Sequence, residues 1–351
     1  MTQGKAKILD SQDISAAVKA IQSGDVVAMP TETVYGLAGN AFDVAAVTKI
    51  FEAKERPSFD PLIVHVNTDK TSVQRLADAE LIDVLAMSPG MTRITESLIK
   101  TFWPGPLTII LPKHRKVPDL VTSGLDRVGL RMPAHPVAQQ LLRDSGLPLA
   151  APSANRFGRI SPTTAAHVFD ELGDRISWII DGGPCEVGVE STVVAIDDDQ
   201  IWLLRPGKIS ADELAKSTGV PVTRAPNVHE KASPGMLASH YAPKKTMRII
   251  SDLKTVKNLI PAGADPKRFS LLVLSGDGAS ELAALKTLGL TPIAINRLTP
   301  AGDANEAARS LFSAMRTLDQ SEGDFILTTS APSSEGLWLA IMDRVTRAST
   351  P

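Results

Sequence analysis

Residues 26–37 read Val-Val-Ala-Met-Pro-Thr-Glu-Thr-Val-Tyr-Gly-Leu, and this stretch indicates the class of the fold. Its first four residues form an apolar run that stops at Pro30, which predicts a short buried strand. Two hydroxyls, a carboxylate and a phenol follow this strand directly. Loops at strand ends carry ligands in many α/β proteins, whereas a capped turn before a helix would explain the same residues equally well.

Outward from this stretch, short apolar runs alternate with amphipathic segments, a pattern typical of α/β proteins. Helices are predicted over residues 11–24 and 43–54, where apolar residues recur at helical spacing. Further strands are predicted at residues 62–66, 107–111, 128–132, 149–151, 178–180, 192–196 and 201–204. Because turns rather than helices separate several of these strands, we expect a mixed, twisted sheet.

The composition changes after Arg205-Pro206-Gly207. A helix predicted over 211–217 precedes the proline-rich stretch 220–245, which is too long for an ordinary connection and is interpreted as a linker or lid. Strands predicted at 247–250, 271–274, 292–295 and 325–327 then alternate with helices, as in a small Rossmann-like domain. We therefore predict an N-terminal α/β domain over 1–219, a linker or lid over 220–245 and a smaller C-terminal α/β domain over 246–351.

The composition excludes several classes of protein. A length of 351 residues indicates about two domains. With 37 basic and 39 acidic residues, the net charge of −2 argues against bulk electrostatic binding of nucleic acid or an acidic membrane. The single cysteine, Cys185, excludes an internal disulfide and a cysteine-based zinc cluster. No apolar run has the length of a signal peptide or a membrane span, so we expect a cytoplasmic protein.

Three familiar ligand motifs are incomplete. The segment 183–188 has the glycine spacing of a phosphate-binding loop, but Val189 stands where that loop requires lysine. Gly276 and Gly278 follow a predicted strand, yet Glu281 occupies the third glycine position of a dinucleotide loop, so a structural turn is favoured. The six histidines show no metal-ligand spacing.

Two cations, Lys54 and Arg56, lie at the end of a predicted helix and just before Pro57. Cations at this position are favoured by the helix dipole, which is one explanation. Because Pro57 prevents the helix from continuing, both side chains could also point into a cleft. Two fixed cations so close together suit a polyphosphate.

Two other polar residues interrupt apolar strands. His65 lies within the strand predicted at 62–66 and is by default a core histidine with satisfied hydrogen bonds. Arg131 ends the strand predicted at 128–132, where burial requires a partner. That partner could be a ligand carboxylate or a carboxylate of the protein.

The remaining polar segments also follow predicted strands or lie in the linker. They are Ala151-Pro-Ser153-Ala-Asn155, Ser161-Pro-Thr-Thr, Gly188-Val-Glu-Ser191-Thr192, Leu204-Arg205-Pro-Gly and His240-Tyr241-Ala-Pro243. No serine or cysteine sits in a nucleophile elbow with a paired base. Several cations and many hydroxyls indicate a cleft that positions small anionic molecules.

Six of these segments, in this order, resemble the YrdC family in its two-domain long form, the threonylcarbamoyl-AMP synthases. They are 30–37, Lys54-x-Arg56, Ser153-x-Asn155, 188–192, 205–207 and 240–243, and the resemblance covers essentially the whole chain. It implies a nucleotidyltransferase that condenses L-threonine, bicarbonate and ATP into L-threonylcarbamoyl-AMP and pyrophosphate. A separate transferase complex would then use the product to modify tRNA.

The resemblance also implies roles for single residues. Lys54 and Arg56 would be catalytic and would bind ATP. The other residues implied for ATP are Asp60, Arg127, Ser153, Asn155, Ser161, Arg205 and Tyr241, and those implied for L-threonine are Thr33, His65, Arg131, Ala151 and Ser191. Mg²⁺ is expected on the phosphates. Since the family often has Asn at the position of Asp60, this carboxylate either coordinates the metal or points away from the phosphates.

Three rival functions remain for comparison. An RNA-binding module without adenylate chemistry is the main alternative, although the near-neutral charge speaks against tight general binding. A carbamoyl transferase of the hydrogenase-maturation type would need zinc-finger cysteines that one cysteine cannot supply. A Rossmann oxidoreductase is disfavoured by the incomplete glycine loop.

Overall fold

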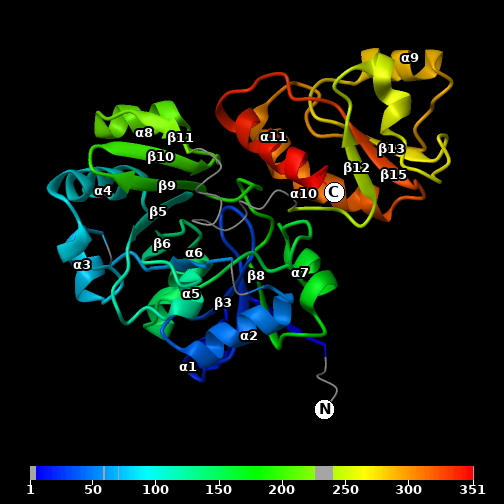
Figure 1. Cartoon of the computed structure of the whole chain (residues 1–351). Coiled ribbons are helices and arrows are strands. Elements are labelled where there is room, and N and C mark those ends of the chain that lie inside the picture. Colours follow the sequence, from blue (N-terminus) through cyan, green and yellow to red (C-terminus); the bar gives the residue numbers. More distant parts are fainter. Residues whose placement is uncertain (1–4, 58–59, 70, 226–239, 351) are drawn as a thin grey trace. The chain divides into compact units, whose positions relative to one another are not determined.

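A computed structural model describes residues 5–57, 60–69, 71–225 and 240–350 (Figure 1). These residues form two compact units, here called unit 1 and unit 2. Unit 1 contains most of the described residues before 226. Unit 2 contains the residues from 240 onward together with two short earlier segments, Gly158–Ser161 and Val187–Val189.

Unit 1 is built on a mixed sheet of eleven strands in the order β1-β8-β2-β3-β7-β4-β6-β5-β9-β10-β11. The strands are β1 (Lys7–Asp10), β2 (Val27–Met29), β3 (Gly36–Asn40), β4 (Ile63–His65), β5 (Leu107–Pro112), β6 (Arg127–Arg131), β7 (Leu149–Ala150), β8 (Trp178–Asp181), β9 (Thr192–Asp197), β10 (Gln200–Arg205) and β11 (Val222–Arg224). Parallel and antiparallel pairs alternate irregularly along the sheet. For example, β4 runs parallel to β6, which runs antiparallel to β5.

The helices of unit 1 connect these strands. They are α1 (Ser15–Gln22), α2 (Val44–Lys54), α3 (Val73–Asp78), the 3-10 helix η1 (Val84–Ala86), α4 (Pro89–Phe102), α5 (Asp119–Thr122), α6 (Pro136–Ser145), α7 (Ala165–Leu172) and α8 (Ala211–Thr218). Local sequence explains several boundaries. Asp43 caps α2 by accepting from the Ala45 N–H, Pro136 opens α6, and Gly146 ends α6 in the left-handed conformation.

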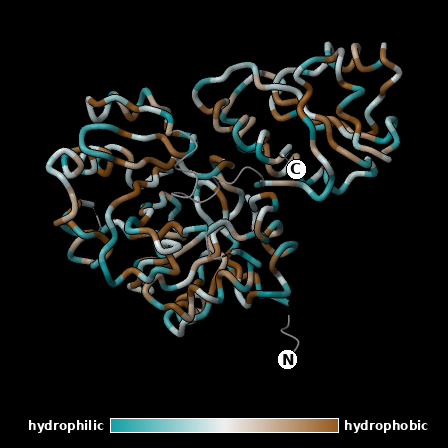
Figure 2. Tube along the Cα trace, viewed as in Figure 1, coloured by the Kyte–Doolittle hydropathy of each residue, from teal (hydrophilic) through white to brown (hydrophobic). Residues whose placement is uncertain are grey.

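The two faces of the sheet are covered differently. The larger core packs apolar residues of α2, α4, α7 and α8 on one face, and α1 with α6 cover part of the other. Apolar residues are concentrated on the strands and on the inner sides of these helices (Figure 2). Among the described residues, the second face over β5, β9 and β10 carries a small cluster built on Ile110, Val193 and Leu204. This part of the sheet is where the polar strand ends gather.

Unit 2 contains a four-stranded, fully parallel sheet in the order β12-β15-β13-β14. Its elements are β12 (Thr246–Ile249), the 3-10 helix η3 (Leu253–Leu259), β13 (Phe269–Val273), α9 (Ala279–Thr287), β14 (Ala294–Arg297), α10 (Ala304–Gln320), β15 (Phe325–Thr328) and α11 (Gly336–Ala348). Helices α10 and α11 contact the strands and each other, while η3 packs with α9. The crossovers make this unit a small α/β domain.

The predicted α/β class is confirmed for both units, and most strands fall within one or two residues of their predicted positions. Some details differ. The stretch after Pro30 is only in part a loop, because Gly36–Asn40 form β3. Residues 222–224, inside the stretch interpreted as a linker, form β11 beside β10. Residues 226–239 of that stretch lie outside the described residues, and residues 240–245 belong to unit 2, so the proposed lid and the domain limits at 219 and 246 stay predictions.

Candidate active site

One edge of the unit 1 sheet collects the polar strand ends. Because β4 and β6 are parallel and β5 is antiparallel to β6, the last residues of β4 and β6 meet the first residues of β5. His65, Arg131 and Thr108 are direct neighbours across these three strands. Ser191 precedes β9, and Arg205 ends β10 at the same edge. The fold thus brings together residues that the sequence separates by up to 140 positions.

Arg131 is the centre of this group, and its side chain is almost fully buried, with 4% of the residue exposed. Its Nη1 donates to the hydroxyl of Thr33 at 2.8 Å, and its Nη2 lies 2.7 Å from Oε1 of Glu32. The second oxygen of Glu32 accepts from the Ala134 N–H at 3.1 Å. Of the two partners considered for Arg131, a carboxylate of the protein is therefore present.

His65 and Thr33 lie beside Arg131 in this group of polar residues. Burial and the charge of Arg131 lower the pKa of His65 to about 3, so the imidazole is neutral. The Thr33 hydroxyl also forms a hydrogen bond with the Thr31 hydroxyl at 2.9 Å. Ala151 lies against Gly36, where an added Cβ would be 3.2 Å from that of Ala151. The small size of Gly36 and Ala151 thus allows the two backbones to approach closely here.

Ser191 lies between strands β5 and β10. Its hydroxyl is 2.8 Å from that of Thr108 and accepts from Nη2 of Arg205 at 3.1 Å. Nε of Arg205 donates to the Ser191 carbonyl at 3.1 Å. The Arg205 guanidinium is consequently fixed at the edge of the sheet.

Lys54 and Arg56 follow α2 and are both buried. Lys54 does not extend into solvent, because its Nζ donates to the carbonyls of Ser153 and Asn155 at 2.5 Å each. Burial and the nearby Arg56 hold the pKa of Lys54 well below that of an ordinary lysine. Lys54 therefore ties the end of α2 to the Ser153–Asn155 loop.

Arg56 forms a buried ion pair with Asp60, whose Oδ2 lies 2.8 Å from Nη2. The same guanidinium donates to the carbonyls of Asp60 and Pro61 at 3.1 and 2.9 Å. Burial raises the pKa of Asp60, and the charges of Arg56, Lys54 and Arg205 oppose that shift. Asp60 is thus paired with Arg56, and the two roles considered for it, metal ligand or carboxylate turned away from the phosphates, stay predictions.

The Ser153–Asn155 loop is held against β3. Ser153 forms an isolated antiparallel bridge with Gly36, and the Tyr35 carbonyl accepts from the Ala154 N–H at 2.8 Å. The side-chain amide of Asn155 donates to the Arg156 carbonyl at 2.7 Å. These contacts indicate that Asn155 supports the loop, while its predicted contact with ATP stays a prediction.

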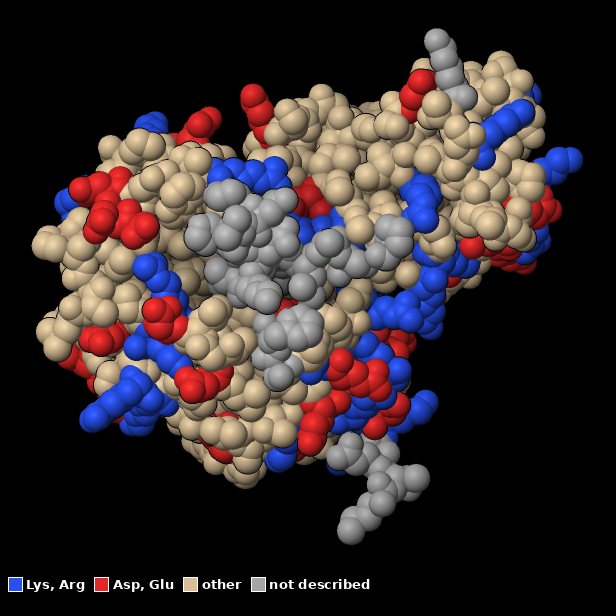
Figure 3. Space-filling model, viewed as in Figure 1, with Lys and Arg blue, Asp and Glu red and all other residues tan. Residues whose placement is uncertain are grey.

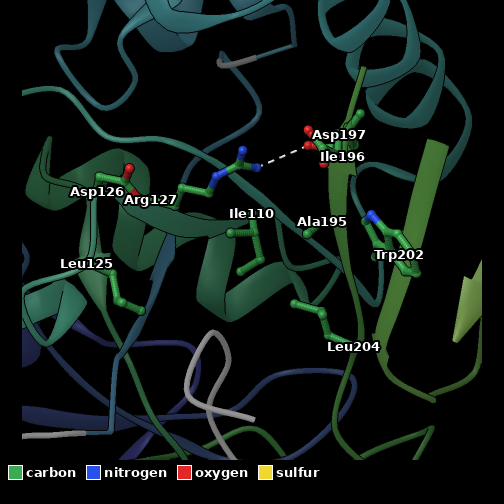
Figure 4. Close-up of a pocket in the computed structure, with 9 residues that line it drawn as sticks. All are labelled: Ile110, Leu125, Asp126, Arg127, Ala195, Ile196, Asp197, Trp202 and Leu204. Atoms are coloured by element: carbon green, nitrogen blue, oxygen red, sulfur yellow. Dashed lines mark hydrogen bonds between the residues drawn. The ribbon is translucent and has the colours of Figure 1, made fainter. Parts of the chain in front are cut away.

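Arg127 lies at the other end of β6 from Arg131 and lines a cavity of about 270 Å³ (Figure 4). Its Nη1 donates to the Ile196 carbonyl at 3.0 Å. The other lining residues are Ile110, Leu125, Asp126, Ala195, Ile196, Asp197, Trp202 and Leu204. The cavity lies over β5, β9 and β10, on the face of the sheet that α1 and α6 cover elsewhere, and its floor is apolar.

Two predicted residues, Ser161 and Tyr241, belong to unit 2. Both are buried there. The Tyr241 ring stacks on Phe312 with centroids 5.6 Å apart, and the Arg344 guanidinium lies over it at 5.6 Å. Its backbone has φ of 63°, an uncommon conformation for a residue other than glycine. Contact between Tyr241 and a nucleotide stays a prediction.

The described part of the chain contains no group of three or more His, Cys, Asp or Glu side chains arranged to hold a metal ion. It also contains no helix that is both long and apolar enough to cross a membrane. On the face shown in Figure 3, basic and acidic side chains are interspersed, as the net charge of −2 leads one to expect.

Sequence reasoning did not assign two residues that the structure places in the site, Glu32 and Thr108. Glu32 lies inside the polar stretch after β2, but nothing local indicates that its partner is Arg131, 99 residues further on. Thr108 is the one polar residue in the predicted apolar strand 107–111, and this feature could have indicated a functional position.

Comparison with known proteins identifies two matching family models that together cover most of the chain. Residues 19–207 match the Sua5/yciO/yrdC family, which is described as "Telomere recombination". Residues 209–350 match the family described as "Threonylcarbamoyl-AMP synthase, C-terminal domain".

Full-length relatives are similar throughout. The chain is 38% identical to the threonylcarbamoyl-AMP synthase of Pyrococcus abyssi, over 97% of this chain and 95% of that protein. It is 39% identical to the Bacillus subtilis protein of the same name, over 95% and 92% of the two chains. The crystal structure of P. abyssi Sua5 complexed with L-threonine matches with a TM-score of 0.79 at 35% identity and covers 98% of each chain.

Proposed function

The chain belongs to the threonylcarbamoyl-AMP synthase family in its two-domain Sua5 form, and we propose that it converts L-threonine, bicarbonate and ATP into L-threonylcarbamoyl-AMP and pyrophosphate. The observation that carries the proposal is the sheet edge where buried Arg131, His65 and Ser191 lie together. The similar P. abyssi protein has been crystallised with L-threonine. Such an edge suits a small zwitterion, because every charge or dipole on it is fixed.

In the proposed complex L-threonine lies against the end of β6. Arg131 binds its α-carboxylate, since a guanidinium offers paired donors to a carboxylate. Thr33 holds Arg131 in place through the 2.8 Å hydrogen bond from Nη1. The small Ala151 leaves room for the threonine side chain, and the Ser191 hydroxyl can donate a hydrogen bond to the substrate.

In the same proposed complex, ATP binds to the neighbouring cationic side chains. Arg56 and Arg205 neutralise charge on the phosphates, and the Ser153 hydroxyl donates a hydrogen bond to them. Lys54 and Asn155 support the Ser153–Asn155 loop, as their hydrogen bonds indicate. We place the adenine in the apolar cavity beside Arg127, whose volume of about 270 Å³ can accommodate a nucleobase.

Mg²⁺ is proposed to arrive with ATP rather than in a prepared protein site. The described residues offer no cluster of metal ligands, and the buried carboxylate of Asp60 faces Arg56. Mg²⁺ commonly keeps several waters and binds substrate phosphates with only one or two protein ligands. The ion is therefore part of the substrate, MgATP.

The proposed reaction has two steps. The threonine amine forms a bond to the carbon of bicarbonate, and water leaves, which gives the N-carboxylate of threonine. An oxygen of this carbamate then attacks the α-phosphorus, and pyrophosphate leaves with the electrons of the broken P–O bond, as in other nucleotidyltransferases. The protein contributes mainly orientation and charge neutralisation. The adenylate would be consumed by a transferase complex that modifies tRNA.

The test is pyrophosphate release by the purified chain with MgATP and bicarbonate, adding each amino acid in turn. We expect release that depends on both L-threonine and bicarbonate, and a product with the mass of threonylcarbamoyl-AMP. Salt-dependent retention of tRNA without any threonine-dependent release would instead favour the RNA-binding alternative.

A further inference from the structure

Glu32 is a buried carboxylate to which the proposed reaction gives no role. Only 5% of the residue is exposed, and the residue lies directly after the strand β2. Its Oε2 accepts from the Ala134 N–H. Its Oε1 is 2.7 Å from Nη2 of Arg131, yet the two groups are not aligned as a hydrogen bond. Oε1 of Glu32 can therefore still accept a hydrogen bond from a ligand.

Further buried polar atoms without a hydrogen bond belong to Arg131, the ion-pair partner of Glu32, and to His65 beside it. Among the described residues, Nε and Nη2 of Arg131 and Nδ1 of His65 also have no hydrogen-bond partner, although each atom is buried. Arg131 and His65 are register neighbours on β6 and β4, so their side chains leave the same face of the sheet. Buried polar groups without partners are rare in folded proteins and call for an explanation.

The four atoms together match one kind of ligand. The two donors of Arg131 suit a carboxylate, the Glu32 oxygen suits a cation with N–H groups, and the imidazole nitrogen suits a hydroxyl. The separation of 2.7 Å between the cationic and anionic atoms fits charges carried on adjacent groups of one small molecule. An α-amino acid with a side-chain hydroxyl has this arrangement.

We propose that Glu32 binds the α-ammonium group of L-threonine, and so selects an amino acid over other hydroxy acids. The proposal rests on the proposed function and adds a residue to it. Glu32 Oε1 accepts from the ammonium while Arg131 holds the α-carboxylate. This contact also fixes the nitrogen, which must lose a proton before it can bond to the carbon of bicarbonate.

The test compares two ligands that differ only at the amine. L-Threonine and (2S,3R)-2,3-dihydroxybutanoate, in which a hydroxyl replaces the ammonium, are titrated into the full chain without ATP by calorimetry. We expect the wild-type chain to bind L-threonine at least about tenfold more tightly, since hydrogen bonds between charged groups are the strong ones. In Glu32→Gln this preference should fall to about threefold or less.

The ratio of the two affinities isolates the ammonium contact. Loss of the counter-charge beside Arg131 changes the binding of both carboxylates alike, so it cancels in the ratio. Glutamine keeps the volume of the side chain and an acceptor for the Ala134 N–H. Glu52→Gln, which removes a carboxylate from an exposed position on α2, is the matched control and should keep the wild-type ratio.

Two outcomes would overturn the inference differently. If Glu32→Gln keeps the wild-type preference, Glu32 does not bind the amine, and the proposed function stands. If the wild-type chain binds neither ligand, the proposed function fails as well. Should Glu32→Gln unfold, as thermal denaturation would show, Glu32→Asp replaces it. That variant keeps the charge but withdraws it by one methylene, and an unchanged preference there also rejects the proposal.

Discussion

At the scale of single residues, the site is assembled from buried ions whose protein partners can be named. Arg131 faces Glu32, and Arg56 faces Asp60. Removing one partner of such a pair leaves a buried charge without compensation, which is costly. Charge changes here should therefore alter stability and substrate binding together unless both partners are changed.

Arg56 provides the first prediction. Arg56→Ala should lower threonine-dependent pyrophosphate release at least about tenfold, because a charge-assisted contact to phosphate is lost. The double variant Arg56→Ala/Asp60→Asn should recover thermal stability relative to the single variant, yet not its activity. Arg93→Ala is the control, since its ion pair with Asp199 is exposed and should matter little to either measurement. Wild-type release from Arg56→Ala would remove Arg56 from the site.

His65 gives a prediction about pH. Its pKa of about 3 in the folded chain lies below the ordinary value of 6.5, so the unfolded chain binds more protons between these values. Stability from this group is complete above about pH 6.5 and falls as the pH drops toward 3, by up to about 1.4 kcal/mol per pH unit. Asp60, whose pKa is raised, contributes with the opposite sign.

Urea unfolding of wild type and His65→Asn at pH 7.5 and pH 5 measures this contribution. The asparagine variant should lose less stability on acidification than wild type. The Asp60 contribution is common to both proteins and cancels in the comparison. An identical pH dependence would mean that His65 is not the neutral, buried group described above.

At the scale of elements, the sheet face over β5, β9 and β10 carries a small apolar cluster among the described residues and contains the cavity beside Arg127 (Figure 4). Ala195 on β9 points into this cavity between Ile110 and Trp202. A larger side chain at Ala195 would occupy the space proposed for adenine.

We therefore predict that Ala195→Leu weakens MgATP binding at least about tenfold, because the added carbons of the leucine side chain would fill the space proposed for the adenine. L-Threonine binding, measured in the same calorimetric experiment, should change less than about twofold. Ala45→Leu, at an exposed position on α2, is the matched control. Equal loss of both ligands would indicate a distorted sheet rather than a filled adenine pocket.

At the scale of the whole molecule, the units do not follow the order of the chain. Unit 2 includes Gly158–Ser161 and Val187–Val189, which come from the first half of the sequence. The Ala242 N–H donates to the Gly158 carbonyl at 2.8 Å, and Arg159 forms a parallel bridge with Ala242. Both segments adjoin predicted substrate residues in the sequence, Ser161 in the first and Ser191 two positions after the second.

Gly188 tests whether this arrangement matters. It has φ of 82°, and an added Cβ would lie 2.4 Å from Cα of Arg309 on α10, which real side chains do not tolerate. Gly188→Ala should thus displace Val187–Val189 from α10 and lower threonine-dependent pyrophosphate release severalfold. Gly183→Ala is a close control, because Gly183 has φ of 78° but open space around its Cα. Equal behaviour of the two variants would assign the effect to backbone strain alone.

The sequence by itself determined the class of the fold and most strand positions, and it predicted two domains and a set of polar site residues. These features are local, because apolar periodicity, prolines and glycines act over a few residues. The resemblance that links the polar segments also depends on short motifs in a fixed order.

Only the tertiary structure decided which groups face one another. Glu32, which follows β2, meets Arg131 at the end of β6 although three strands lie between them in the sheet, and no local pattern encodes this pairing. Likewise, Lys54 reaches the carbonyls of Ser153 and Asn155, about a hundred residues away, instead of extending toward solvent at its helix end. Strand order and register are set by the packing of the entire core, and the partners of each buried charge follow from that packing.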